Sequence, residues 1–274
     1  MKPTVIAFAN QKSGVGKTTT AVNLGIGLVM QGKKVLLVDA DSQGNLTDAL
    51  GWKNPDALED TLPSVLRKII NDEPIEPKEA ILHHGEGVDL IPSNIELSAL
   101  ELTLFQTMRR EYVLADWLKS VKQDYDYVLI DCSPSLGMIT INALTAADSV
   151  IIPVQSHYLP TKGMTQLMQT INRVRRGLNP LLRVDGVLLT MTDHRTLLSR
   201  DVAQALRSSY AGKVRIFETE IPFSIRTAEA AAAGRSVFSH DGNGKAAAAY
   251  ESLTKEVERY GRQRARADRD QFGR

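Results

Sequence analysis

Short hydrophobic runs alternate with longer amphipathic segments along the chain. The runs carry few polar residues at alternating positions, which is typical of strands that helices cover on both faces of a parallel sheet. We therefore expect a strand at each of five runs, which span residues 4–9, 35–38, 127–130, 149–154 and 184–189.

The segments between these runs show helical spacing. In residues 18–31, Val22, Ile26 and Val29 lie on one helical face, and Gly32 follows as a C-terminal cap. Similar patterns lie at about residues 61–72, 94–105, 110–120, 138–146, 162–176, 199–208 and 244–260. The alternation predicts an α/β fold, with a doubly wound, mostly parallel sheet flanked by helices on both faces.

The domain organisation is expected to be simple, because no internal repeat, linker or low-complexity block divides the chain. We expect a single domain over residues 1–261. Residues 52–90 are rich in Pro, Asp and Glu, which indicates a peripheral elaboration. After Gly261 only Phe272 is large and apolar, so residues 262–274 are expected to form a polar C-terminal tail, which is either a solvated helix end or a frayed segment.

Composition and charge narrow the functional classes. The 274 residues include 33 Lys+Arg and 32 Asp+Glu, so a nucleic-acid contact would need a local basic patch. The single cysteine, Cys132, excludes an internal disulfide framework, a four-cysteine zinc site and a cysteine-held iron–sulfur cluster within one chain. No apolar run approaches the roughly 20 residues that span a bilayer, and the N-terminus lacks a signal-peptide pattern. We expect a soluble, cytoplasmic protein.

Residues 11–19, QKSGVGKTT, follow the first expected strand and begin the first expected helix. This context is that of a phosphate-binding loop and predicts a P-loop NTPase fold. Gly14 and Gly16 let successive N–H groups converge on phosphate oxygens, and the helix N-terminus adds positive partial charge. Lys17 would reach the β- and γ-phosphates, while the Thr18 hydroxyl would bind Mg²⁺. The alternative is a glycine-rich turn with a solvated lysine.

The loop departs from the usual spacing at its start. Gln11 stands where a glycine is expected, and Lys12 follows it. A second lysine beside the triphosphate has two interpretations. It is either a local charge on a solvated loop or a cation that reaches a phosphate in a neighbouring subunit.

Three segments resemble the ParA/MinD ATPases. Residues 12–19 resemble their deviant phosphate loop, residues 35–47 resemble the next motif of the ParA branch, and residues 125–134 resemble its Walker B segment. The resemblance extends from residue 4 to about residue 258 and is closer to ParA/Soj partition ATPases than to MinD.

The resemblance implies an ATP-bound homodimer with Mg²⁺ and assigns roles at the phosphates. Lys12 would cross the dimer interface to the partner's nucleotide, and Asp41 would orient the attacking water. Thr18, Asp39 and Asp131 would form or border the magnesium site. The structural alternative is that the aspartates cap the loops after their strands. The nucleotide-binding residues implied at the loop are Lys12, Ser13, Gly14, Val15, Gly16, Lys17, Thr18 and Thr19, of which Lys12 and Lys17, together with Asp41, would be catalytic.

The base and DNA contacts follow from the same resemblance. The sequence lacks an Asn-Lys-x-Asp guanine signature, which favours ATP. Adenine would lie near Met191 and Pro222, although either residue could belong to the core. Arg195 and Arg226 match positions that the family uses for non-specific duplex DNA. Phe223, where arginine is frequent, weakens that match.

The expected function is therefore an ATP-dependent, dimerising switch ATPase that positions or segregates DNA with a ParB-like centromere-binding partner. Its turnover would be slow and stimulated by that partner. The alternative is a MinD-like or other cargo-positioning ATPase that acts on a membrane or protein cluster. A membrane anchor would need bulky apolar residues at the C-terminus, and only Phe272 follows Tyr260 there, so we expect no membrane partner. A metabolic P-loop enzyme or metal-cluster carrier is disfavoured by the lone cysteine and by the absence of a recognisable second substrate motif.

Overall fold

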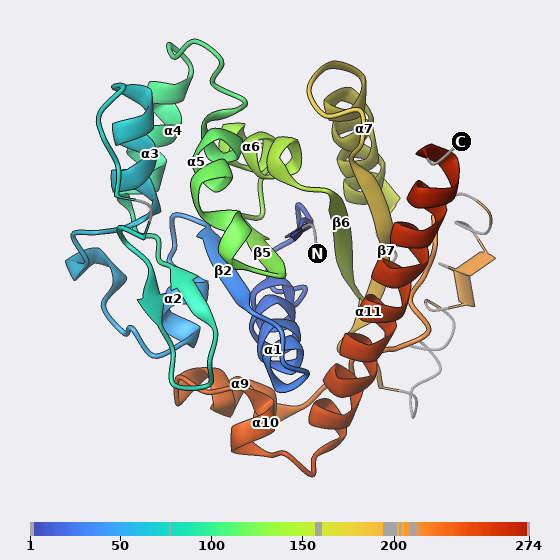
Figure 1. The fold of residues 1–274 in the computed structure, drawn as a ribbon. Coiled ribbons are helices and arrows are strands. Elements are labelled where there is room, and N and C mark those ends of the chain that lie inside the picture. Colours follow the sequence, from blue (N-terminus) through green and yellow to red (C-terminus); the bar gives the residue numbers. More distant parts are fainter. Residues whose placement is uncertain are drawn as a thin grey trace.

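The computed structural model describes residues 3–76, 78–156, 161–193, 202, 204–205, 207–208, 212 and 214–272. Its centre is a seven-stranded sheet in the order β3-β4-β2-β5-β1-β6-β7 (Figure 1). All neighbouring strands pair in parallel except β3 and β4, which are antiparallel. The strands are β1 (Thr4–Phe8), β2 (Val35–Ala40), β3 (Leu82–His83), β4 (Asp89–Ile91), β5 (Tyr127–Cys132), β6 (Ser149–Gln155) and β7 (Arg183–Thr190).

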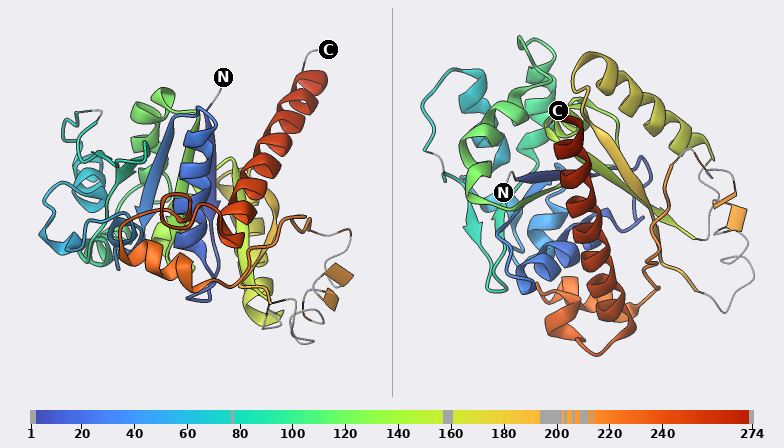
Figure 2. Two further views of the ribbon diagram at one scale, coloured as in Figure 1. Left: turned by 90° about the horizontal axis from the view of Figure 1, so that it is seen from below. Right: turned by 45° about the vertical axis from the view of Figure 1, so that its right-hand side comes forward.

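Helices cover both faces of this sheet, as the hydrophobic runs predict (Figures 1 and 2). Alternate residues of β1 enter two different cores: Val5 and Ala7 pack with α3 to α7, whereas Ile6 and Phe8 pack with α1 and α11. Because both sets are buried, the strand has no polar alternation. The helices are α1 (Lys17–Met30), α2 (Asn45–Ala49), η1 (Pro55–Ala57), α3 (Leu62–Ile70), α4 (Glu96–Leu104), α5 (Val113–Val121), η2 (Lys122–Asp124), α6 (Met138–Ala146), α7 (Thr161–Gly177), α9 (Ile225–Ala232), α10 (Val237–His240) and α11 (Lys245–Phe272).

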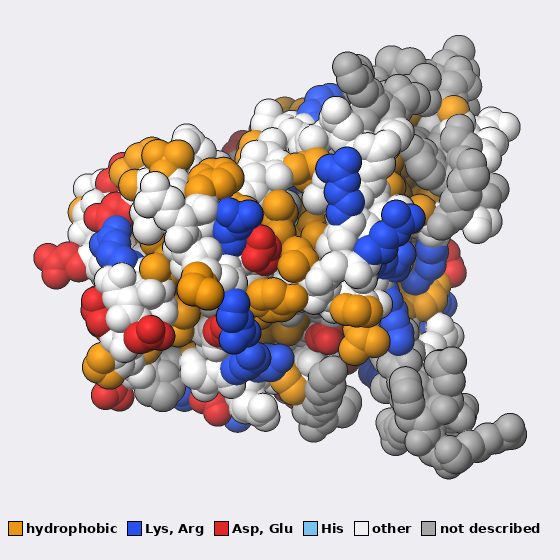
Figure 3. All heavy atoms as spheres, turned by 90° about the horizontal axis from the view of Figure 1, so that it is seen from above, with side chains coloured by type: hydrophobic (Ala, Val, Ile, Leu, Met, Phe, Trp, Pro, Cys, Tyr) orange, Lys and Arg blue, Asp and Glu red, His pale blue; other side chains and the backbone are white. Residues whose placement is uncertain are grey.

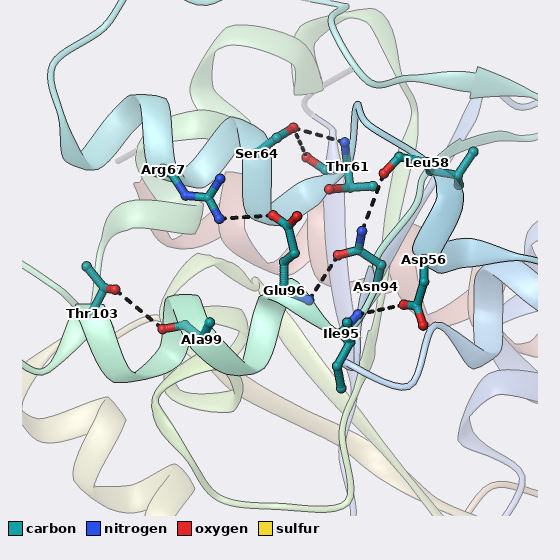
Figure 4. A network of polar contacts seen from close by, with 10 residues as sticks. All are labelled: Asp56, Leu58, Thr61, Ser64, Arg67, Asn94, Ile95, Glu96, Ala99 and Thr103. Carbon is teal, nitrogen blue, oxygen red and sulfur yellow. Dashed lines mark hydrogen bonds and ion pairs between the residues drawn. The ribbon is translucent and has the colours of Figure 1, made fainter.

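The peripheral segment around residues 52–96 is held by polar contacts (Figure 4). The side chain of Arg67 on α3 pairs with Glu96 at the start of α4 at 3.0 Å. The backbone N–H of Ile95 donates to Asp56 Oδ1 at 3.1 Å. These contacts join η1, α3 and α4 at the edge of the sheet, so the elaboration is ordered by its own network.

The last helix continues into the polar tail. The helical pattern ends near residue 260 in the sequence, whereas α11 continues to Phe272 and extends beyond the body of the molecule (Figure 2). Half of the expected helix at 199–208 lies outside the described residues, and the described residues 202, 204–205 and 207–208 are helical.

Within the part of the chain that the structure describes, no helix is both long and apolar enough to cross a bilayer.

Strand register brings the candidate site together. Phe8 at the end of β1 lies beside Asp131 on β5, and Asp131 lies beside Asp39 on β2. The carboxyl ends of parallel strands meet at one edge of a sheet, which is where ligands bind in doubly wound folds. The phosphate loop and both aspartates therefore lie at the same edge.

Candidate nucleotide-binding site

The loop between β1 and α1 is shaped by contacts with β6 and β7. Gly16 has φ 84°, a left-handed conformation that glycine adopts without strain. The Thr190 hydroxyl donates to the carbonyl oxygen of Val15 at 2.8 Å, and Gln155 Nε2 donates to that of Gly14 at 2.7 Å. Since α1 begins at Lys17, its first N–H groups have no carbonyl partner within the helix and are available to an anion.

The two lysines of the loop occupy different environments. Lys17 is 7 % exposed, and its Nζ donates to the carbonyl oxygen of Lys12 at 3.4 Å. Lys12 Nζ donates to Gln155 Oε1 at 3.0 Å on the exposed side of the loop. Lys17 therefore lies within the curl of the loop, as the phosphate-loop prediction requires. The contact of Lys12 with a neighbouring subunit stays a prediction.

Asp131 and Thr18 form a pair suited to a cation. The Thr18 hydroxyl donates to Asp131 Oδ2 at 2.6 Å, while Asp131 Oδ1 is buried with no hydrogen-bond partner among the described residues. Burial raises the pKa of Asp131, and the nearby charge of Asp39 raises it further. A buried carboxylate oxygen without a partner is costly unless a ligand satisfies it. The pair therefore fits Mg²⁺.

The protein alone provides few direct ligands at this point. In the described ranges, no group of three His, Cys, Asp or Glu side chains is arranged to hold a metal ion. This agrees with Mg²⁺, which usually keeps several waters and binds one or two protein oxygens together with substrate phosphates.

Asp39 is engaged by the loop that follows it. Its Oδ2 accepts hydrogen bonds from the N–H and the hydroxyl of Thr47, at 2.9 and 2.7 Å, and its Oδ1 accepts one from the N–H of Asp41 at 3.3 Å. Burial raises its pKa despite these bonds. Asp39 thus caps the loop after its strand, which is the structural alternative that the sequence left open. It lies beside Asp131. Its role near the metal stays a prediction.

Asp41 lies in the turn between β2 and α2 and is 7 % exposed. Its Oδ1 accepts a hydrogen bond from the N–H of Gln43 at 3.1 Å, and its carbonyl accepts one from the N–H of Gly44 at 3.0 Å. The turn therefore holds Asp41 two residues beyond Asp39, at the same edge of the sheet as the phosphate loop.

The residues expected to border adenine lie near each other in the fold, because Pro222 pairs with Thr192, the residue after Met191. Met191 follows β7 with φ 51°, and Pro222 forms a parallel bridge with Thr192. Met191 Sδ accepts a hydrogen bond from Gln155 Nε2 at 3.3 Å. Gln155 thereby connects this pair to the phosphate loop.

Sequence reasoning missed two of these residues, Gln155 and Thr190. Both hydrogen-bond to the loop across more than a hundred positions of sequence. Gln155 could have been singled out, because it is the polar last residue of a strand whose other residues are all buried.

The α2–α9 contact connects the nucleotide edge to another surface. Lys53 Nζ donates to the carbonyl oxygens of Asp48 and Ala231, at 2.9 and 3.2 Å. Beside it the backbone of Gly51 approaches that of Gly234 so closely that a Cβ on Gly234 would lie 2.6 Å from the Gly51 Cα. Only glycine permits such an approach.

Of the two residues expected to bind DNA, the structure describes Arg226. Arg195 lies outside the described residues. The side chain of Arg226, on the first turn of α9, is 64 % exposed and pairs with Glu229 at 3.0 Å. Hydrogen bonds from His240 and then Arg226 lower the pKa of Glu229. Phe223 is 62 % exposed next to α9.

Charged side chains are also dispersed elsewhere on the surface. On the face that Figure 3 shows, Lys and Arg side chains lie in separate groups between hydrophobic and acidic ones. This agrees with the near-zero net charge, and a DNA contact would have to be local.

Comparisons with known proteins agree with this geometry. A family described as an AAA domain matches residues 3–184. The "Chromosome partitioning protein ParA" of Caulobacter vibrioides is 44% identical over 255 residues, which cover 92% of this chain and 93% of that protein. The "Sporulation initiation inhibitor protein Soj" of Bacillus subtilis is 44% identical over 253 residues, or 92% of this chain and 97% of that protein.

A solved structure extends the likeness to three dimensions. It is described as cobyrinic acid a,c-diamide synthase from Mycobacterium smegmatis with bound ADP and magnesium. It superposes with a TM-score of 0.82 and 37% sequence identity, and the match covers 99% of this chain and 97% of that one. Together with the phosphate loop and its aspartates, these matches show that the chain belongs to the AAA-domain family matched above and, within it, to the ParA/Soj group of partition ATPases.

Proposed function

We propose that this ATPase is a nucleotide-dependent dimerising switch, which binds duplex DNA without sequence preference and positions or segregates it with a ParB-like partner. The observation that carries the proposal is the Thr18–Asp131 pair, with its unpartnered buried oxygen, at the phosphate loop. The named activity of the Caulobacter relative, chromosome partitioning, supports the DNA role.

The loop and its lysine would bind the triphosphate. The free N–H groups of α1 and the residues from Ser13 to Thr19 would surround the phosphates, and Lys17 would neutralise the β- and γ-oxygens. Thr18 and Asp131 would hold Mg²⁺, Asp131 through water, with Asp39 beside them. When bound, Mg²⁺ would neutralise charge on the phosphates. Met191 and Pro222 would contact the base.

Hydrolysis would depend on a positioned water. Asp41 would accept a hydrogen bond from this water and orient it for in-line attack on the γ-phosphoryl group. The bonds from Thr47 to Asp39 would keep the turn that carries Asp41 in place. Turnover would be slow without the partner, because a positional switch needs a long-lived ATP state.

Dimerisation would use Lys12. Lys12 Nζ bonds to Gln155 Oε1 on the exposed side of the loop. In a dimer, the nucleotide of the second copy would replace this oxygen as the partner of Lys12. Lys12→Ala should bind ATP but fail to dimerise and to hydrolyse it. Asp41→Ala should bind ATP and accumulate as a dimer.

Light scattering with ATP, with ADP and without nucleotide measures these states. Wild type with ATP is the reference for a dimer. A normal dimer of Lys12→Ala, or an ATP-bound monomer of Asp41→Ala, would show that the two roles are wrongly assigned.

DNA binding would require the ATP dimer, because two copies place twice as many basic side chains on one surface. With about five phosphates neutralised, the log–log slope of affinity against salt should be on the order of −4 to −5. Retention on unrelated duplexes, compared with ATP, with ADP and without nucleotide, tests this. ATP-loaded protein that ignores DNA at low salt would overturn the DNA role. The protein would associate with the nucleoid only when ATP is bound.

The proposed domain boundary keeps residues 1–261 as the ATPase domain and residues 262–274 as a polar C-terminal extension. Because α11 continues through this boundary, the extension would project as a helix over residues 262–272. A protein truncated after Gly261 should keep its ATP affinity.

A further inference from the structure

An irregular segment at residues 215–223 lies along β7 and carries Pro222. The N–H of Val187 donates to the carbonyl of Arg215 at 2.8 Å, and the N–H of Phe217 donates to that of Val187 at 2.9 Å. Further along, the N–H of Ile221 donates to the carbonyl of Leu189 at 2.9 Å. One side of the segment is thus bound to the sheet.

The other side of the segment is held by one carboxylate of α11. Glu256 Oε1 accepts hydrogen bonds from Arg215 at 2.6 Å and from the N–H of Glu218 at 2.9 Å. Its Oε2 accepts one from the N–H of Thr219 at 2.9 Å. The side chain of Glu256 is only 4% exposed. A single buried side chain therefore binds two consecutive backbone N–H groups of the segment.

The charge of Glu256 is stabilised where it lies. Burial by itself raises the pKa of Glu256, but the hydrogen bonds from the two backbone N–H groups and the charge of Arg215 outweigh burial and lower it. The guanidinium of Arg215 is in turn stacked against the rings of Tyr260 and Phe217, 2.9 and 4.8 Å from their centroids. The carboxylate is ionised, and bonds to an ionised acceptor are the strong ones.

The position of Glu256 on α11 is fixed by the core. Leu253 and Val257, on the same helix, are 0% and 2% exposed and pack in the cluster that contains α1. Only Glu220 and Ile221 separate Thr219 from Pro222. The rigid helix therefore fixes the backbone of Glu218 and Thr219, three residues before Pro222, while Ile221 itself is bonded to Leu189 and Thr192.

We propose that Glu256 is a positioning residue for nucleobase recognition, which acts through the backbone of Glu218 and Thr219 to place Pro222 beside Met191. The inference rests on the proposed function, because that proposal locates adenine at these two residues. Binding surfaces must be held to within about 0.5 Å to discriminate ligands. Pro222 has no N–H of its own to bond to β7, so its placement depends on its neighbours.

Glu256→Gln tests the role with little change in size. One carboxylate oxygen becomes an NH₂ group, which then faces either the N–H of Thr219 or the donors of Arg215 and Glu218. At least one donor loses its acceptor. Glu258→Gln is the matched control, because Glu258 is also a largely buried α11 carboxylate, 9% exposed, yet pairs with Lys33 and Arg262 instead.

Three probes separate base recognition from phosphate binding. Affinities for ATP, GTP and inorganic tripolyphosphate are measured by calorimetry with Mg²⁺. Glu256→Gln should weaken ATP binding by up to about tenfold, because the base must then order a segment that is loose in the free protein. It should leave tripolyphosphate binding unchanged and reduce the preference for ATP over GTP. Amide hydrogen exchange at Glu218 and Thr219 should accelerate. Glu258→Gln should change none of these.

A second variant keeps the test decisive if Glu256→Gln does not fold. Glu256→Asp preserves the charge beside Arg215 but is shorter by one methylene, so it should also lose the preference for ATP over GTP.

The outcomes distinguish this inference from its premise. It is overturned if a folded Glu256 variant keeps the preference of wild type for ATP, or if tripolyphosphate binding falls by the same factor as ATP binding. If wild type itself binds ATP, GTP and tripolyphosphate equally, the base contact of the proposed function fails together with it.

Discussion

The phosphate loop with its aspartates and the first turn of α9 are built in opposite ways. Lys17, Asp39 and Asp131 are 7%, 0% and 1% exposed, whereas the side chain of Arg226 is 64 % exposed. Burying charged groups opposes folding unless they gain partners, while an exposed arginine costs the fold little. The phosphate edge therefore indicates a ligand by itself, and the α9 surface does not.

The phosphate edge and α9 also differ in what each would gain from a ligand. At the phosphate edge, a cation would satisfy the free oxygen of Asp131. At α9, DNA would have to displace the pairing of Arg226 with Glu229, which the free protein already has. Variants should thus have large effects at the first region and small ones at the second.

The largest effect is expected for Lys17→Ala. Removing the buried cation within the loop should lower the affinity for MgATP by at least about 100-fold, since charged hydrogen bonds to phosphate are lost in a site partly closed to water. Calorimetry measures the loss. Lys33→Ala, which removes a lysine that pairs with Glu258 just after the other end of α1, is the control and should bind normally. A folded Lys17→Ala protein with normal ATP affinity would show that the phosphate edge is no more sensitive to substitution than α9.

The next effect concerns the stability of the nucleotide-free protein. Asp131→Asn keeps an acceptor for Thr18 but removes a charge that burial disfavours. At pH 8 it should raise the free energy of unfolding by about 2 kcal/mol, because a buried unpaired charge is replaced by a neutral group. MgATP should stabilise this variant less than wild type. Denaturation with and without nucleotide is the measurement, and a less stable nucleotide-free variant would contradict the argument.

The free energy of unfolding should also depend on pH through the two buried aspartates. Burial raises the pKa of Asp39 to about 7 and that of Asp131 to about 8, against about 4 in the unfolded chain. Between about pH 4 and pH 8 these two carboxyls bind more protons in the folded protein than in the unfolded chain, so their contribution to the free energy of unfolding falls as the pH rises through this range. From pH 6.5 to 7.5, without Mg²⁺, the free energy of unfolding should fall by about 1–2 kcal/mol.

This trend has a direct control. Mg²⁺ with nucleotide favours the ionised carboxylates and should flatten the decline, and Asp131→Asn should remove part of it. Stability that rises over this interval in the nucleotide-free protein would show that burial does not govern these two groups.

The smallest effect is expected at α9. Arg226→Ala should weaken ATP-dependent binding to all duplex sequences by about three- to tenfold and flatten the salt slope by about two, because each copy of the dimer loses one phosphate contact. Glu229→Gln, which removes the partner of Arg226, should strengthen binding. Filter binding at several salt concentrations measures both, and Lys255→Ala, at an exposed pair on α11, is the control. ATP affinity should not change. If neither α9 variant alters DNA binding, this surface has no part in it.

The fold was predictable where the signal was local. The continuous hydrophobic runs of β1, β2, β5, β6 and β7 were sufficient, because burial on both faces leaves a mark in the sequence itself. The strands β3 and β4 were not predicted, since two and three residues carry no periodicity. The sequence left open whether the residues after Gly261 extend the last helix or fray, because they lack an apolar face, although their Ala, Arg and Gln residues favour helix.

The residues of the candidate site also fall into two groups: those that a local sequence pattern reveals and those whose contacts depend on the fold. Lys17 and Thr18 belong to one contiguous motif, and Asp39 and Asp131 each end a hydrophobic strand, so they could be named from the sequence. Their roles stay predictions. Gln155, Thr190 and Glu256 could not be given their contacts, because each depends on the folded chain bringing distant segments together. The pairing of Arg226 with Glu229 is at helical spacing and was available in the sequence.

The contact of Gly51 with Gly234 has a mechanical consequence. Backbone touches backbone there, so no side chain can change rotamer to absorb a shift of one segment against the other. Gly51 follows α2, whose Thr47 binds Asp39, and Gly234 follows α9, which carries Arg226. A movement of the segment after α2 toward α9 would therefore press directly on the backbone of Gly234.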